Sequence, residues 1–346
     1  MSEQIPAEWG NFYLKDVSFV NLMMRRIYNV LIVANPYDAF MLEDDGRVEE
    51  KIYNEYMELG LRYPPTFTQV STTEEASKVL NTVDIDLVIC MPGNADNDAF
   101  DVARAVKAEF PDIHCVVLTP FSHGITKRIQ NEDLSIFDYV FCWLGNTNLI
   151  LSIIKLMEDK MNIDNDIHEV GVQMILLVED SIRFYSSILP NLYSYILTQS
   201  QNFATEALTR HEASLRQRGR PKVVLARTYE EAWEIYQRYK DNCLGVISDV
   251  RFPINNVEDK SSSATEGNIP VVEKDPEAGL KLLRAIRKED EYLPLIIESS
   301  ESENREKAEA EGFRFVDKNS KKMSVDLRHL LEEHMGFGDF IFRNPE

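Results

Sequence analysis

The sequence predicts an α/β protein that contains two copies of one fold. Short apolar runs alternate with helical patterns, and two such series follow one another along the chain. This alternation is typical of a parallel sheet whose strands are joined by crossover helices. A length of 346 residues also exceeds the roughly 100–200 residues of one ordinary domain. We therefore expect two domains with separate hydrophobic cores.

Five apolar runs form the first series and predict one five-stranded parallel sheet. They are NVLIVAN (29–35), FTQV (67–70), DLVICM (86–91), HCVVLT (114–119) and DYVFCW (138–143). Five further runs repeat the pattern and predict a second sheet: VQMILLVED (172–180), KVVLAR (222–227), LGVISDV (244–250), LPLIIESS (293–300) and FRFVDK (313–318). The repetition within one chain indicates two copies of the same architecture.

The stretches between and around these runs define the expected domain boundaries. Residues 1–25 are an N-terminal extension, 26–161 the first domain, 162–171 a polar linker, 172–334 the second domain and 335–346 a tail. The second domain contains two insertions, a charged segment at 199–221 and a Ser/Glu/Asn-rich loop at 254–275. We expect both insertions to lie at the surface.

Composition excludes several classes of function. A net charge of −21 without an offsetting basic stripe argues against nucleic-acid binding. No apolar run approaches the ~20 residues of a membrane helix, and the N-terminus lacks the features of a signal peptide. The four cysteines form no C-x-x-C pair that would suggest a zinc or redox site. We expect a protein that stays in the cytoplasm, without nucleic-acid or membrane partners.

Polar residues follow four strands of the second series. Glu179 and Asp180 end the first strand, Asp249 the third, Ser299 the fourth and Lys318 the fifth. The carboxyl ends of parallel strands meet at one edge of the sheet, where open α/β folds place their functional sites. We therefore expect three carboxylates, a hydroxyl and an ammonium group to converge there.

This set of residues suits phosphoryl transfer. Closely spaced carboxylates repel one another and stay ionised when a cation compensates them. Mg²⁺ prefers oxygen ligands and is held in phosphoryl-transfer sites by one or two carboxylates. We expect Asp180 and Asp249 to bind it directly and Glu179 to act through water. Asp249 can then attack a phosphorus atom while Lys318 balances the developing charge.

The second series, with these residues at its strand ends, resembles the response-regulator receiver domains. LLVEDS (176–181) is similar to their acid-pair strand, VISDVRFP (246–253) to the phosphoacceptor strand, EAGLKLLRAIR (277–287) to the following helix and FVDK (315–318) to the lysine strand. The resemblance implies a flavodoxin-like (CheY-like) doubly wound fold with strand order 2-1-3-4-5 in each copy. It also implies that a histidine kinase or phosphotransfer protein phosphorylates Asp249.

The resemblance assigns three further roles. The backbone carbonyl of Arg251 would complete the protein ligands to Mg²⁺. Ser299 stands at the position of the switch hydroxyl, which turns toward the phosphoryl oxygens in the family. Phe315 stands at the position of the switch aromatic, which changes rotamer. Such changes would bias a two-state surface that contacts a downstream protein partner or domain.

Two features depart from the family pattern. Glu298 precedes the switch position, where the family usually has an apolar or small residue. The insertion at 254–275 follows the acceptor strand directly, and we expect it to control donor access or partner choice.

The first copy lacks the residues of this chemistry. Met91 stands where the acceptor aspartate would be, Ala34 and Asn35 replace the acid pair, and Cys142 replaces the lysine. Only Thr119 remains, at the switch position. A thioether neither attacks phosphorus usefully nor binds Mg²⁺ well. We expect a degenerate receiver that serves in docking or dimerisation.

Weaker signals carry less weight. Acidic residues often follow strands, so Glu179, Asp180 or Lys318 taken singly would not predict a functional site. The order of these residues along the chain, taken together, does predict one. His211 in RHEASLR is best explained as part of a solvated helix face. Neither phosphate-binding glycine motif, G-x-x-x-x-G-K-[ST] or G-x-G-x-x-G, is present.

The sequence is most consistent with a phosphorelay response regulator that has no catalytic domain of its own. Analogy with the family suggests that it forms a homodimer. Two alternatives stay open. Residues around 12–56 are similar to the leading region of long phosphoenolpyruvate synthase-like proteins, which place receiver-like domains before a pyruvate phosphate dikinase-type part. The chain would then be the regulatory region of a larger enzyme. In the other alternative both copies are a scaffold and Asp249 is never phosphorylated.

Overall fold

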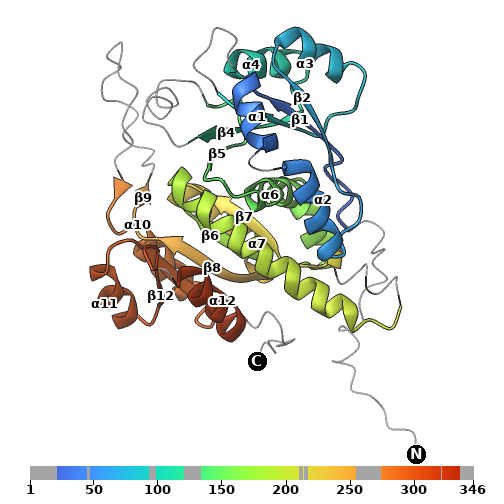
Figure 1. Ribbon diagram of the computed structural model, residues 1–346. Helices are drawn as coiled ribbons and strands as arrows, with labels where there is room; N and C mark the ends of the chain where they lie inside the picture. Colours follow the sequence, from blue (N-terminus) through green and yellow to red (C-terminus); the bar gives the residue numbers. More distant parts are fainter. Residues whose placement is uncertain are drawn as a thin grey trace, which may run out of the picture.

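A computed structural model describes residues 22–44, 47–92, 99–120, 134–209, 213, 217–254, 274–320 and 322–335. In this part of the chain, two five-stranded sheets lie one above the other in Figure 1, each with helices against its faces. We call residues 22–170 the first unit and residues 171–335 the second unit.

The first sheet has the order β2-β1-β3-β4-β5, and all of its strand pairs are parallel. Its strands are β1 (Asn29–Val33), β2 (Thr66–Val70), β3 (Leu87–Cys90), β4 (His114–Pro120) and β5 (Tyr139–Trp143). The helices described in this unit are α1 (Pro36–Asp44), α2 (Val48–Glu58), α3 (Thr73–Leu80), α4 (Ala99–Glu109) and α6 (Asn148–Asn165), and α6 is followed by the π-helix η3 (Asp166–Val170).

The second sheet repeats this order, read as β7-β6-β8-β11-β12, and is also parallel throughout. Its strands are β6 (Met174–Val178), β7 (Lys222–Ala226), β8 (Cys243–Asp249), β11 (Leu295–Ser299) and β12 (Arg314–Asp317). The helices are α7 (Ile182–Thr205), α9 (Tyr229–Tyr239), the 3₁₀ helix η4 (Lys240–Asn242), α10 (Ala278–Glu289), α11 (Glu303–Ala310) and α12 (Met323–His334). The strand order 2-1-3-4-5 in both units confirms the predicted doubly wound fold.

Equivalent helices of the two units begin with the same capping pattern. The Thr72 hydroxyl accepts a hydrogen bond from the Glu75 backbone N–H, and Thr228 does the same for Glu231, each at 3.2 Å. The glutamates reach back to the backbone before the cap, at Ser71 N and Arg227 N. The reciprocal bonds satisfy backbone donors that the first turn of a helix leaves unpaired. The internal repeat therefore extends to the start signals of α3 and α9.

Helices α6 and α7 lie between the two sheets (Figure 1). One buried apolar cluster includes residues from both sheets and from both helices, such as Val30, Ile154, Ile188 and Ile247. The faces that point away from the junction have their own clusters, against α3 and α4 in the first unit and α9 and α10 in the second. The units therefore share a hydrophobic core.

A buried ionic network crosses the same junction. Asp159 on α6 accepts two hydrogen bonds from the Arg220 guanidinium at 2.8 and 2.9 Å and one from the Tyr193 hydroxyl at 2.8 Å. The Lys222 ammonium lies 2.7 Å from the Asp166 carboxylate. All of these side chains except Tyr193 are charged, and at most 3% of each residue's surface is exposed. Opposite charges and hydrogen bonds offset the cost of removing them from water.

Several predicted segments lie partly or wholly outside the described residues. Residues 162–171, expected as a linker, form the end of α6 and the π-helix η3. Helix α7 continues into the predicted insertion at 199–221, of which residues 210–212, including His211, and 214–216 lie outside the described residues. Most of the insertion at 254–275, the first 21 residues and residues 336–346 also lie outside them. No helix in the described part of the chain has the length and apolar character of a membrane span.

Candidate functional site

The ends of β6, β8 and β12 place charged side chains close together in the second unit. Carboxylate oxygens of Glu179, Asp180 and Asp249 lie within 4.8 Å of one another. The Lys318 ammonium donates a hydrogen bond to Asp249 Oδ1 at 2.6 Å and another to Glu179 Oε2. The structure thus brings together the four charged residues that the sequence predicts at this edge of the sheet.

Lys318 is held tightly in the cluster. Only 1% of its side chain is exposed, and its ammonium lies 4.6 Å from the centre of the Phe184 ring on α7. Burial alone would lower the pKa of Lys318, but the carboxylates of Glu298, Glu179 and Asp249 raise it. The side chain therefore stays a cation at the point where the acidic groups meet.

Glu179 is the most deeply buried acid of the group and has no exposed surface. Its Oε1 atom accepts a hydrogen bond from the Ser181 backbone N–H at 2.9 Å, at the start of α7. Burial raises the pKa of Glu179 to about 8; Lys318 opposes this shift, and Asp249 and Glu298 add to it. Glu179 therefore gains a proton easily unless another cation lies nearby.

Asp180 has one oxygen paired and one unpaired. Its Oδ2 atom lies 2.6 Å from the ammonium of Lys274, which ends the insertion at 254–275 and belongs to the short strand β10 (Lys274–Asp275). Strand β10 pairs with β9 (Phe252–Pro253), which follows β8 in the sequence. The Asp180 Oδ1 atom is buried and has no hydrogen-bond partner among the described residues. Burial raises the pKa of Asp180, against the effect of Lys274.

The charges of this cluster favour a divalent cation. With Glu298 included, the cluster holds four carboxylates and two ammonium groups. When all four carboxylates are ionised, one divalent cation would bring the formal charge of the cluster to zero. The unpaired Oδ1 of Asp180 offers it a ligand atom. An oxygen-only donor set suits Mg²⁺. The Arg251 backbone N–H donates to Asp249 Oδ2 at 3.3 Å, whereas the role of its carbonyl as a ligand stays a prediction.

Ser299 ends β11, and Phe315 lies within the neighbouring strand β12. The Ser299 hydroxyl accepts hydrogen bonds from Asn304 Nδ2 at 3.0 Å and from the Glu301 backbone N–H at 3.1 Å. These bonds hold it toward the start of α11. Phe315 is half-buried, and the Arg305 guanidinium lies over its ring, 4.7 Å from the centre. Both expected switch residues therefore contact α11.

Glu298 is an unusual residue for a protein core, because its carboxylate is buried without a hydrogen-bond partner among the described residues. It is fully buried, it lies in register with Asp249 on the neighbouring strand, and neither of its carboxylate oxygens has a hydrogen-bond partner among the described residues. Burial raises the pKa of Glu298 to about 7, with Lys318 opposing and Asp249 adding to the shift. Its sequence position predicted an anomaly, and the structure identifies it as a fourth carboxylate beside the cluster.

Three residues of the site were not predicted from the sequence. Lys274 lies in a polar insertion where no pattern marks it, and Asn304 resembles any polar residue at a helix start. Gly279 allows α10 to approach the loop that follows Asp249, because a Cβ atom there would lie 1.9 Å from the carbonyl oxygen of Asp249. A glycine early in an amphipathic helix is a signal that could have revealed this close approach.

The equivalent positions of the first unit contain no charged cluster. Ala34, Met91, Thr119 and Cys142 are all buried. Asn35 caps a helix, since its Oδ1 atom accepts hydrogen bonds from two backbone N–H groups at the start of α1. This position, acidic in the second unit, here stabilises local structure.

Comparison with known proteins gives structural similarities alone. No family model and no curated protein sequence matches the chain. Similar solved structures include the receiver domain of a signal transduction histidine kinase from Syntrophus aciditrophicus, with 18% identity, a TM-score of 0.28, and coverage of 38% of this chain and 91% of that one. The response regulator TrrA from Thermotoga maritima, solved with Mg²⁺ and BeF, shows 19% identity, a TM-score of 0.27, and coverage of 37% and 97%.

A third similar structure extends over both units. It is described as a two-component system response regulator/GGDEF domain protein, and it shares 14% identity and a TM-score of 0.34 over 88% of this chain and 98% of its own. The chain is thus similar to response-regulator receiver structures. Its fold is assigned from its own strand order, because these TM-scores are low.

Proposed function

We propose that the second unit is a receiver for two-component signal transduction and accepts a phosphoryl group on Asp249. The observation that carries this proposal is the hydrogen bond of 2.6 Å between Lys318 and Asp249, inside a cluster that also contains Glu179 and Asp180. The donor would be a phosphohistidine of a histidine kinase or phosphotransfer protein.

The chemistry follows from the positions of these groups. A carboxylate oxygen of Asp249 attacks the phosphorus atom, the phosphorus–nitrogen bond of the donor breaks, and its electron pair stays on the imidazole. An acyl phosphate remains on Asp249. Mg²⁺, when bound, supplies positive charge for the transferring group. Asp180, Asp249 and the Arg251 carbonyl would hold it directly and Glu179 through water, and Lys318 would balance the negative charge that develops on the transferring group.

The output would come from Ser299 and α11. For its hydroxyl to reach a phosphoryl oxygen, Ser299 must give up its hydrogen bonds with Asn304 and Glu301. Those bonds tie the end of β11 to the start of α11, so their loss would free this segment to move. Phe315 lies beside it and contacts Arg305 of the same helix. The altered α11–β12 surface would then contact a protein partner.

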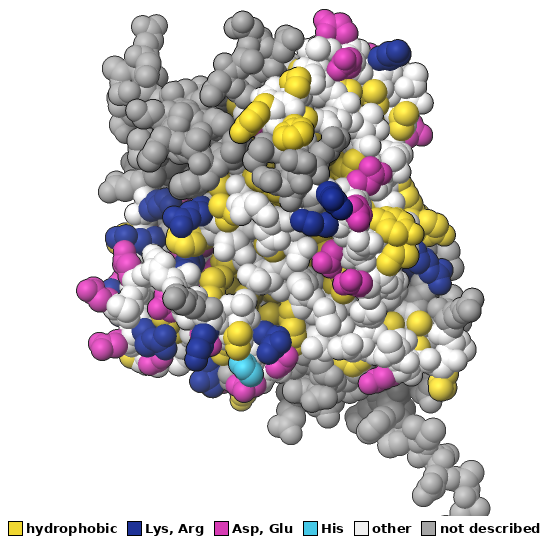
Figure 2. Space-filling view, viewed as in Figure 1, with side chains coloured by type: hydrophobic (Ala, Val, Ile, Leu, Met, Phe, Trp, Pro, Cys, Tyr) yellow, Lys and Arg dark blue, Asp and Glu magenta, His cyan; other side chains and the backbone are white. Residues whose placement is uncertain are grey.

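The first unit would serve in docking or dimerisation. Tyr37 and Phe40 on α1 and Tyr53 and Met57 on α2 are large apolar side chains that are at least 49% exposed. Figure 2 shows apolar side chains on this side of the molecule, over the upper unit. Exposed apolar groups of this kind are common in protein contact surfaces. They support the proposal without identifying the partner.

Intact-mass measurement tests the proposed function. The purified chain is incubated with Mg²⁺ and acetyl phosphate or phosphoramidate, alongside Asp249→Asn and Met91→Ala. We expect a phosphoryl-sized gain in mass for the wild type and Met91→Ala, and none for Asp249→Asn. Met91→Ala is a matched control because Met91 occupies the equivalent position in the first unit. A gain that persists in Asp249→Asn, or no gain with any donor, would contradict the proposal.

A further inference from the structure

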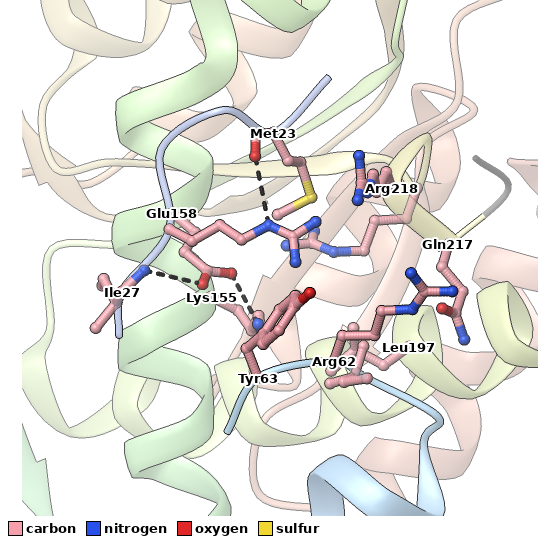
Figure 3. Close-up of a pocket in the computed structure, with 12 residues that line it drawn as sticks. Met23, Ile27, Arg62, Tyr63, Lys155, Glu158, Leu197, Gln217 and Arg218 are labelled. Atoms are coloured by element: carbon pink, nitrogen blue, oxygen red, sulfur yellow. Dashed lines mark hydrogen bonds and ion pairs between the residues drawn. The ribbon is translucent and has the colours of Figure 1, made fainter. Parts of the chain in front are cut away.

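A second candidate site is a cavity at the junction of the two units, far along α7 from the acid cluster. Segments of both units line it: the chain before β1, the connection between α2 and β2, helix α6, helix α7 and the segment before β7. Figure 3 shows the cavity and the residues around it.

Three arginines from separate segments converge on this cavity. Arg26 precedes β1, Arg62 lies between α2 and β2, and Arg218 precedes β7. None of the three forms an ion pair with a carboxylate of the described residues; Arg26 donates a hydrogen bond to the Met23 carbonyl at 3.4 Å. Burial and the nearby Arg26 and Arg62 lower the pKa of Arg218. The guanidinium groups therefore lie close enough to repel one another.

The acidic residue that lines this cavity does not relieve the repulsion. Glu158 is buried, its Oε2 atom lies 2.7 Å from the Lys155 ammonium, and its Oε1 atom accepts a hydrogen bond from the Ile27 backbone N–H at 3.3 Å. In Figure 3, Glu158 and Lys155 lie on one side of the cavity and Arg62 and Arg218 on the other. The charge of Glu158 is thus compensated on its own side.

Three arginines that lie together without a carboxylate partner are unusual for so acidic a protein. Its 58 acidic residues exceed its 37 lysines and arginines, and several other arginines pair with carboxylates, as Arg251 does with Glu301 and Arg284 with Glu311. A fold that gathers three arginines, none of them paired with the one acid of the lining, maintains a local positive potential against a strongly negative molecule. A negatively charged ligand would stabilise this arrangement.

The geometry points to a binding site for a small phosphorylated molecule, which we propose as a second ligand site of this protein. Planar guanidinium groups match the paired oxygens of phosphate, and several of them neutralise a charge greater than that of one carboxylate. The Gln217 amide and the exposed Tyr63 ring add polar and aromatic groups to the lining. Because both units contribute arginines, the ligand would bridge them.

Titration with inorganic pyrophosphate tests this site. Binding is measured by calorimetry at constant ionic strength and in the presence of EDTA, with the wild type, Arg62→Gln/Arg218→Gln, and Arg284→Gln as the matched control. Both substituted arginines are at least partly exposed, so the fold should be kept, which circular dichroism would verify. We expect saturable binding to the wild type. The affinity should fall roughly tenfold or more in the double variant, since each charge-assisted hydrogen bond contributes substantially to the free energy of binding. Arg284→Gln should bind as the wild type does.

The outcomes separate this site from the acid cluster. Asp249→Asn should bind pyrophosphate with the affinity of the wild type, because Asp249 does not line the cavity. The absence of saturable binding to the wild type would overturn the proposal. An equal affinity in the wild type and the double variant, or an equal loss in Arg284→Gln, would overturn it as well, because binding would then reflect general attraction to exposed arginines.

Discussion

At the scale of single residues, the acid cluster is a problem of charge compensation. The raised pKa values of Glu179 and Glu298, about 8 and about 7, show that burial makes both carboxylates hold protons more readily. Lys318 cannot compensate every acid around it. The contribution of the cluster to stability should therefore depend on pH, and a bound cation would favour the ionised carboxylates.

Glu298 gives a prediction for the metal-free protein. Its ordinary pKa of 4.5 rises to about 7 on folding, so the stabilisation it contributes is complete below about 4.5 and is lost as the pH rises to about 7. Glu298→Gln removes this loss. The free energy of unfolding of the variant relative to the wild type should increase by up to about 3 kcal/mol between about pH 5 and pH 8. Urea unfolding in EDTA measures it.

The control for this experiment is Glu303→Gln, which changes an exposed acid at the start of α11. It should show no comparable dependence on pH. A difference between Glu298→Gln and the wild type that stays constant over this range would mean that Glu298 does not titrate on folding as described.

Lys274 gives a second prediction at this scale. Its ammonium repels a cation bound at Asp180, but it is half exposed and solvent screens the effect. Lys274→Gln should therefore raise the affinity for Mg²⁺ by no more than roughly fivefold. Titration calorimetry measures it, with Lys281→Gln as control, since Lys281 pairs with Asp275 instead. A weaker affinity would show that Lys274 is needed to hold Asp180 in place.

The four charged residues expected at this edge of the sheet could be predicted because each ends or follows a recognisable strand. Asp249 and Lys318 end apolar runs whose order along the chain places them at one sheet edge. Lys274 could not be found in this way, because it reaches Asp180 through the two-stranded β9–β10 pair, whose two-residue strands have no periodic pattern. Glu298 could be singled out, but its lack of a partner depends on packing.

At the scale of elements, α10 packs closely against the loop that follows Asp249. The Gly279 N–H donates a hydrogen bond to the Val250 carbonyl at 3.0 Å, and there is no room for a side chain against Asp249. Gly279→Ala should either destabilise the second unit by about 1–3 kcal/mol, as overpacking does, or displace the loop. Denaturant unfolding and the rate of phosphorylation by acetyl phosphate measure these effects.

Lys288→Ala, near the other end of α10, provides the control for this element. It introduces the same residue, alanine, in an exposed part of the helix and should alter neither quantity appreciably. If Gly279→Ala matched the wild type in both stability and phosphorylation, the close packing between α10 and the Asp249 loop would be wrong.

The ten sheet strands could be predicted from the sequence because their apolar runs are short and each unit repeats the same spacing. The end of α7 could not. Its last turns contain Gln199, Ser200, Gln201 and Asn202, polar residues that resemble an insertion, yet the helix continues to Thr205. Contacts with the first unit support these turns, including a hydrogen bond from the Gln201 amide to the Glu58 carbonyl at 2.6 Å.

At the scale of the whole molecule, the two units form one structure. The shared core and the Asp159–Arg220 pair join them through α6 and α7. The sequence predicted a polar linker at 162–171 because Asn162, Asp164 and Asp166 resemble exposed residues. In the structure Asp166 is buried and compensated by Lys222, a pairing that sequence periodicity cannot reveal.

Unfolding of the two units should therefore be cooperative. Trp143 lies on β5 of the first unit and Trp233 on α9 of the second, so Trp143→Phe and Trp233→Phe each leave one reporter of the described fold, with Trp9 common to both. We expect the two fluorescence transitions in urea to have the same midpoint after correction for each variant's stability measured by circular dichroism. Two separate midpoints would show that the units unfold independently.

The central claim is that phosphorylation occurs in the second unit alone, and its most direct test is to locate the modification. The chain is phosphorylated by a small phosphodonor with Mg²⁺, the acyl phosphate is reduced with borohydride to homoserine, and the peptides are identified by mass. We expect homoserine at position 249 and unmodified peptides from the first unit. Homoserine at any aspartate of the first unit, or at another residue in place of Asp249, would contradict the account.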